Sequence, residues 1–173
     1  MGLIVKAKKE FSPIEDGIYQ GVCVGVYELG TQVNKVDGKE RVKVLIEWEI
    51  PTEGGIYYVN KMYTKSLSSN STLFKDLTSW IGNVGSSFDL EQLLGLNAQL
   101  MVKNIDVNGK TYTNVISVMG IPRTMKTIEP QKKPILYTLE QGFVFPEGVP
   151  EWVQNIIKNS KEYQAYLENI PFN

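Results

Sequence analysis

The sequence predicts a mainly β protein. We expect a five-stranded barrel with one helix between its third and fourth strands, followed by a C-terminal arm and helix. Three observations support this. Five segments have the alternating or β-branched pattern of strands. The hydrophobic period becomes helical between the third and fourth of them. After Gly120 the composition turns proline-rich and loses its period. The predicted parts are a barrel domain over residues 1–120, an arm or linker over 121–149, and a helix with its tail over 150–173.

The first three strands are predicted at residues 17–30, 40–50 and 56–65. In the first strand, Gly21 and Gly25 mark the sharp bending found at barrel corners. The second strand has the clearest alternation, in which Val42, Val44, Ile46, Trp48 and Ile50 share one face. The third strand is rich in tyrosine and β-branched residues, which favour strands.

A helix follows, with Ser69 or Ser71 as its N-cap and Gly82 at its end. Leu73, Leu77 and Trp80 recur at helical spacing. A second short helix is predicted at 88–95. The fourth and fifth strands are expected at 98–107 and 111–121, joined by the hairpin turn that Asn-Gly favours. This order of strands and helix is that of the OB-fold. The proline-rich 121–149 stretch is predicted to be an extended arm, and residues 150–173 a single helix with its tail.

Composition excludes several functions. The chain has no histidine and one cysteine, which excludes His-based catalysis, typical zinc sites and an intramolecular disulfide. We expect no cofactor, metal or catalytic residue. The sequence shows no apolar run near the roughly 18 residues of a membrane helix, so no membrane partner and a cytoplasmic location are expected. The net charge of −1 argues against bulk electrostatic binding of nucleic acid and leaves binding through a local groove.

OB-folds bind oligonucleotides across strands 2 and 3 and the neighbouring loops. We expect the strand-3 face with Lys61 to point outward, because a lysine inside a small barrel would be costly. Lysines and arginine would neutralise phosphates, and tyrosines would stack on bases. The alternative is a solvated face with half-buried tyrosines. The predicted DNA-binding residues are Arg41, Lys43, Tyr57, Lys61, Tyr63, Lys65, Lys103, Lys110 and Tyr112.

Other features have simpler interpretations. Glu47 and Glu49 could hold Mg²⁺, but adjacent strand carboxylates usually face solvent, and this is what we expect here. Cys23 is expected to pack in the core and Trp80 to close the bottom of the barrel. The C-terminal helix either packs on the barrel or a second subunit, or docks a partner. For the last residues, "ENIPFN", local packing after a Pro171 helix stop is favoured over a partner-recruiting tip.

Several stretches, "GIYQGVCVGVYELGTQ", "VLIEWEIP", "YTKSLSSNSTLFKDLTSW", "FDLEQLLGLNAQLMV" and "PEWVQNIIKNSKEY", resemble phage and prophage single-stranded DNA-binding proteins. The resemblance implies an OB-fold protein that coats single-stranded DNA during phage replication or recombination in the bacterial host. Together with the residue pattern it leads to an expectation of non-enzymatic binding with little sequence preference. A homo-oligomer such as a dimer is expected, with replication or recombination proteins as candidate partners of the C-terminal region. The alternative is a phage protein-interaction or structural module that does not bind nucleic acid.

Overall fold

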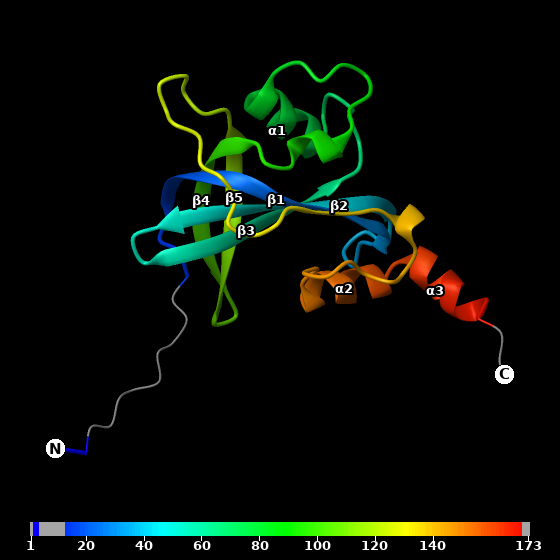
Figure 1. Cartoon of the computed structure of the whole chain (residues 1–173). Helices are drawn as coiled ribbons and strands as arrows, with labels where there is room; N and C mark the ends of the chain where they lie inside the picture. Colours follow the sequence, from blue (N-terminus) through cyan, green and yellow to red (C-terminus); the bar gives the residue numbers. More distant parts are fainter. Residues whose placement is uncertain (1, 4–12, 171–173) are drawn as a thin grey trace.

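The computed structural model describes residues 2–3 and 13–170, and over these residues the chain is mainly β (Figure 1). It has six strands and three α-helices, with two short 3₁₀ helices, η1 and η2. The elements, in chain order, are β1 (Gly17–Val33), β2 (Glu40–Thr52), β3 (Gly55–Thr64), α1 (Thr72–Ile81), η1 (Leu90–Leu93), β4 (Asn97–Val107), β5 (Lys110–Met119), β6 (Ile135–Tyr137), η2 (Leu139–Gln141), α2 (Glu151–Lys158) and α3 (Lys161–Glu168).

Five strands form an antiparallel sheet in the order β3-β2-β1-β4-β5, and β6 adds to β1 in parallel. β1 pairs with β4 through residues 17–22 and with β2 through residues 22–33. The ladder with β2 shifts register between Cys23 and Gly25, where a Cβ on Gly25 would lie 2.5 Å from the Tyr27 ring. The predicted strands and the bent first strand are thus confirmed.

The two edge strands, β3 and β5, lie next to each other. Among the described residues no hydrogen-bonded ladder joins them, so the sheet is open along this line. We call it the β3–β5 seam. The predicted closed barrel is therefore not what the strand pairing shows.

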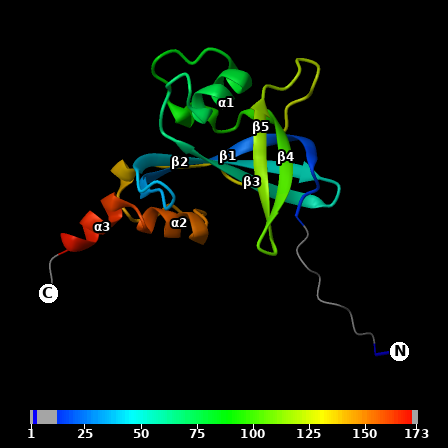
Figure 2. The same cartoon turned by 180° about the vertical axis from the view of Figure 1, so that it is seen from behind.

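The main core fills the concave side of the sheet, and α1 covers one end of it (Figures 1 and 2). Ser71 caps α1 by accepting a hydrogen bond from the Phe74 N–H. The helix buries Leu73, Leu77 and Trp80, and the Trp80 ring lies 5.7 Å from Trp48 between centroids. As predicted, Trp80 and Cys23 are core residues.

A second hydrophobic cluster lies on the opposite face of β1 and β2, away from α1 (Figure 1). Tyr27, Leu29 and Leu45 of the sheet pack there against residues of the C-terminal segment: Ile135 and Tyr137 of β6, Val149, and Val153 and Ile157 of α2. The stretch predicted as an extended arm or linker, residues 121–149, contains the short strand β6 and the 3₁₀ helix η2 and runs over the outer face of β2. One of the two interpretations of residues 150–173, packing on the sheet, is confirmed for α2.

The predicted single C-terminal helix is two helices. α2 ends at Lys158, and the buried Ser160 starts α3 by accepting a hydrogen bond from the Tyr163 N–H. A serine that bonds to a nearby N–H offers the backbone an alternative to helix, which explains the break. Pro171 to Asn173 lie outside the described residues. No helix in the described part of the chain is long and apolar enough to cross a membrane.

The structure also corrects the orientation of strand 3. Val59 and Tyr63 are buried in the main core, opposite Trp48 and Val44 of β2. Directly paired residues of neighbouring strands point to the same side of a sheet. The face with Lys61 is therefore the inner one, and Tyr58 and Met62 lie on the outer face.

Candidate nucleic-acid interface

The outer face of β2 is not open to a ligand. Glu47 and Glu49, expected to face solvent, are 4% and 1% exposed. Glu49 accepts hydrogen bonds from the backbone N–H groups of Gln131 and Lys132, at 2.7 and 2.9 Å. Glu47 accepts hydrogen bonds from the Lys132 ammonium at 3.1 Å and the Tyr27 hydroxyl at 3.3 Å. Two carboxylates on this face would repel phosphate, so we exclude it as a DNA-binding surface.

These contacts also account for both carboxylates without a metal ion. Buried charges in proteins are normally paired and hydrogen-bonded, as they are here. Over residues 2–3 and 13–170, no group of three or more acidic or cysteine side chains could hold a metal ion.

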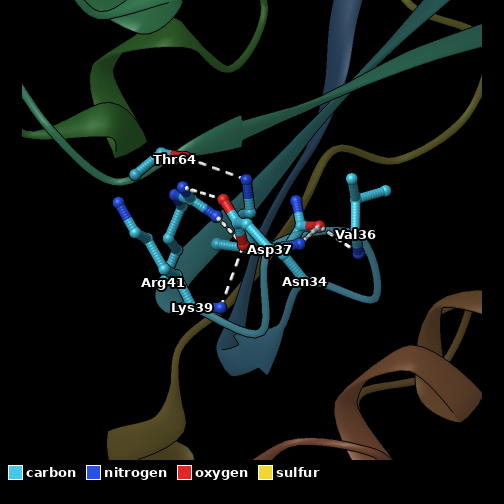
Figure 3. Close-up of polar contacts among 7 residues, drawn as sticks. Asn34, Val36, Asp37, Lys39, Arg41 and Thr64 are labelled. Atoms are coloured by element: carbon cyan, nitrogen blue, oxygen red, sulfur yellow. Dashed lines mark hydrogen bonds and ion pairs between the residues drawn. The ribbon is translucent and has the colours of Figure 1, made fainter.

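Arg41 and Lys43 lie at the beginning of β2, next to the β1–β2 loop, and both side chains are engaged locally. Figure 3 shows Arg41 beside Asp37. The Arg41 guanidinium contacts both carboxylate oxygens of Asp37, at 2.8 and 3.3 Å. The hydrogen bond from Arg41, together with the one from the Lys39 N–H, holds the pKa of Asp37 below its usual range. Lys43 donates a hydrogen bond to Thr64 Oγ1 at 2.8 Å. Burial lowers the pKa of Lys43, and the nearby charge of Arg41 lowers it further.

Lys61, Tyr63 and Lys65 are also engaged. The Lys61 ammonium and the Tyr63 hydroxyl both contact Asp76 Oδ2 of α1, at 2.8 and 2.7 Å. Tyr63 is 2% exposed, and burial together with the Asp76 charge raises its pKa. Lys65 forms a 3.0 Å ion pair with Glu28. Tyr63 cannot stack on a base from this position, and the two lysines already have acidic partners.

A pocket of about 320 Å³ opens at the β3–β5 seam. Tyr57 and Tyr58 line it from β3, and Thr111 and Thr113 line it from β5. Tyr57 is half-buried against the main core, whereas Tyr58 is 46% exposed. The seam thus offers aromatic rings and hydroxyl groups beside two strand edges.

The three remaining predicted residues, Lys103, Lys110 and Tyr112, are exposed on the β4–β5 hairpin. Asn108 and Gly109 form its turn with positive φ values of 52° and 79°, as the sequence predicts. Among the described residues no ion pair engages Lys103 or Lys110. Tyr112 is 51% exposed and lies opposite Ile105.

The structure therefore divides the nine predicted residues. Tyr57 lines the seam pocket from the inner face of β3, and the outer face of the neighbouring β4–β5 hairpin carries Lys103, Lys110 and Tyr112. The edge of the sheet where β2 begins and β3 ends carries Arg41, Lys43 and Lys65. The inner face of β3 carries Lys61 and Tyr63. Sequence reasoning missed Tyr58, because tyrosines occur on both faces of β3. The neighbouring Val59 could have indicated the position of Tyr58. Its β-branched side chain suits the inner face, which puts Tyr58 on the outer face.

The chain matches no known protein-family model, and no curated protein is significantly similar to it.

Proposed function

We propose that this chain is a non-enzymatic single-stranded DNA-binding protein with an OB-type arrangement, acting in phage DNA replication or recombination in the host cytoplasm. The strand order, with a first strand that pairs with both β2 and β4 and a helix between β3 and β4, supports the OB-type assignment. The sequence resemblance is what suggests the phage role.

The observation that carries the proposal is the exposed outer face of the β4–β5 hairpin, where Tyr112 lies with Lys103 and Lys110, for which no ion pair is found among the described residues. The hairpin adjoins the β3–β5 seam, whose pocket Tyr57 and Tyr58 line. Stacked bases contribute about 1–3 kcal/mol each on such rings, with little preference for sequence. We therefore place the DNA along the seam and hairpin rather than across β2.

The decisive experiment is fluorescence anisotropy of the full chain with labelled oligo-dT at several salt concentrations. If Lys103 and Lys110 each neutralise one phosphate, the logarithm of affinity should fall with that of salt at a slope of about −1.4 per subunit. Lys103→Glu with Lys110→Glu should weaken binding at least tenfold. Lys133→Glu with Lys158→Glu, exposed residues of the C-terminal segment, makes the same charge change as a control. Absence of binding at micromolar protein and low salt would exclude the proposal.

The second candidate is a protein-interaction module of the same fold. The outer face of β4 and β5 exposes apolar side chains around the lysines, among them Met101, Ile105 and Ile116, which are 38–47% exposed. Exposed apolar patches often mark protein interfaces. This candidate is favoured if oligo-dT does not bind and the Met101→Asp, Ile105→Asp variant keeps the fold but loses self-association or capture of a defined partner.

A further inference from the structure

The connection between β5 and β6 begins with a basic loop at one end of the sheet. Residues 121–128 lie beside α1, at the opposite end of β4 and β5 from their hairpin (Figures 1 and 2). Arg123 and Lys126 of this stretch are exposed, and no ion pair engages either of them among the described residues. The stretch contains no carboxylate. We call residues 121–128 the basic loop.

Side chains of the sheet hold the basic loop in place. Gln20 Nε2 of β1 donates a hydrogen bond to the carbonyl oxygen of Lys126 at 2.7 Å. Asn97, at the start of β4, accepts a hydrogen bond from the Ile128 N–H at 2.8 Å and donates one to the Ile128 carbonyl oxygen at 3.0 Å. Gln20 also donates to Asn97 Oδ1 at 3.0 Å. A loop fixed in this way has little conformational freedom left to lose when it binds a ligand.

The surface beside the basic loop is hollowed. A hollow of about 300 Å³ opens where β4 begins and β5 ends, between the end of α1 and the loop. Leu96, which is 39% exposed, and the half-buried Ile81 and Ile121 give this hollow apolar walls. Apolar walls next to two cations suit a ligand that has both a flat ring and an anionic group. A nucleotide has both, because every base offers a π-face and is linked to a phosphate.

The outer face of β4 connects this hollow with the hairpin. The residues of β4 on this face alternate with the core residues Leu100 and Val102, and they are Gln99, Met101, Lys103 and Ile105. None of these four is acidic. Gln99 pairs with the loop anchor Gln20, and Ile105 pairs with Tyr112 of the hairpin.

The length of this face fits a short stretch of DNA. From Gln99 to Ile105 the strand spans about 20 Å at about 3.3 Å per residue. At about 3.4 Å per nucleotide of a stacked strand, this distance corresponds to about six nucleotides. OB-folds cover about 4–16 nucleotides of a single strand, so one strand can reach both ends of this face.

We propose that the basic loop is the second end of the DNA path. The strand that the hairpin binds continues along the outer face of β4 to the hollow, where Arg123 and Lys126 bind phosphates and a base rests on Leu96. This inference rests on the proposed function, single-stranded DNA binding. It extends that function to a loop outside the strand 2–3 surface and the β1–β2 and β4–β5 loops that OB-folds usually use.

The salt dependence of oligo-dT affinity, measured by fluorescence anisotropy of the full chain, tests the loop. Two phosphate contacts at the hairpin and two at the loop predict a slope of about −2.8 per subunit for the logarithm of affinity against that of salt. Arg123→Gln with Lys126→Gln should reduce the slope to about −1.4 and weaken binding at low salt at least about fivefold. Lys133→Gln with Lys158→Gln removes the same charge at two exposed sites of the C-terminal segment, so it should keep the wild-type slope and affinity.

A second pair of variants tests the hollow. Leu96→Glu places a carboxylate where the base would rest, so it should weaken oligo-dT binding at least about fivefold. Val144→Glu makes the same change at an apolar residue of the C-terminal segment that is 86% exposed, and it should bind like the wild type. All the substituted residues are exposed, so the fold should persist, and unchanged urea unfolding midpoints would verify this.

The results separate this inference from the proposed function. If the wild type does not bind oligo-dT, both are rejected. If the wild type binds but the loop variant matches its lysine control in slope and affinity, only the role of the basic loop is rejected. Equal affinities of Leu96→Glu and Val144→Glu would likewise exclude the hollow as the end of the DNA path.

Discussion

The carboxylate of Glu49 in β2 accepts a 2.7 Å hydrogen bond from the backbone N–H of Gln131, a residue 82 positions later in the chain. The adjacent N–H of Lys132 donates to the other oxygen at 2.9 Å. One buried carboxylate thus holds the segment before β6 against the sheet. This contact is the reason why the outer face of β2 is unavailable for DNA.

Replacing Glu49 should destabilise the protein. Glu49→Ala leaves two N–H groups without their acceptor, and hydrogen bonds to a charged group contribute about 1.5–3 kcal/mol to stability. We expect a loss of at least about 2 kcal/mol in the free energy of unfolding, measured by urea denaturation, and faster proteolysis between residues 121 and 149. Glu53→Ala, at an exposed site in the β2–β3 turn, serves as the control. Equal stability of the two variants would show that Glu49 does not hold this segment.

Substitutions of two tyrosines should distinguish an effect on DNA affinity from an effect on folding stability. Tyr112→Ala removes an exposed ring, so we expect oligo-dT affinity to fall by about 1–3 kcal/mol with an unchanged unfolding midpoint. Tyr63→Phe removes the buried hydrogen bond to Asp76, so we expect a loss of about 1–2 kcal/mol in stability with unchanged affinity. Anisotropy and urea denaturation of the same samples provide both measurements. The reverse pattern would return the DNA site to the β2–β3 positions predicted from sequence.

The buried thiol of Cys23 should make the protein sensitive to alkali. Burial raises its pKa from the ordinary 9.0 to about 12. Above pH 9 the unfolded chain loses this proton while the folded chain keeps it, so stability is present below pH 9 and falls as pH rises toward 12. Between pH 9 and 10 the slope of unfolding free energy against pH should be negative. In Cys23→Ala that slope should be less negative, with the remainder coming from buried tyrosines such as Tyr63, whose pKa is also raised. A slope equal to that of the wild type would show that Cys23 does not contribute.

The strand order could be predicted from sequence because the signals were local. Alternation in β2, the Asn108–Gly109 turn and the Ser71 cap each depend on a few neighbouring residues. The candidate site was harder to predict because it depends on which face of a strand is covered. In β3 both faces carry tyrosines, and the choice was set by a distant residue, Asp76, which pairs with Lys61 and lets a lysine lie on the inner face.

The C-terminal segment shows the same limit. β6 has three residues, too few for a periodic signal, and it forms because β1 offers a free edge at residues 25–27. Glu47 and Glu49 have the alternation of an exposed face, and their burial is explained by distant donors, chiefly Gln131 and Lys132. Contacts of this kind leave no pattern in the residues around them.

The contact of α3 with β1 should respond to acid. Glu162, in the first turn of α3, accepts hydrogen bonds from the Thr31 backbone N–H at 2.7 Å and from the Thr31 hydroxyl at 2.5 Å. Burial alone would raise the pKa of Glu162, but these hydrogen bonds outweigh it, and the pKa lies below its ordinary 4.5. The stabilisation is therefore present above pH 4.5 and is lost as pH falls through the lower pKa of the folded state.

We expect the hydrogen-exchange protection of the Thr31 N–H to decrease with acid below pH 4.5 in the wild type. Glu162→Gln should show weaker protection at neutral pH and little change on acidification, because its amide does not titrate. Glu168→Gln, at the exposed end of α3, should behave like the wild type. If Glu162→Gln keeps full protection at neutral pH, the carboxylate does not hold α3 on β1. The position of α3 would then depend on the packing of Tyr163 and Tyr166 against Phe143.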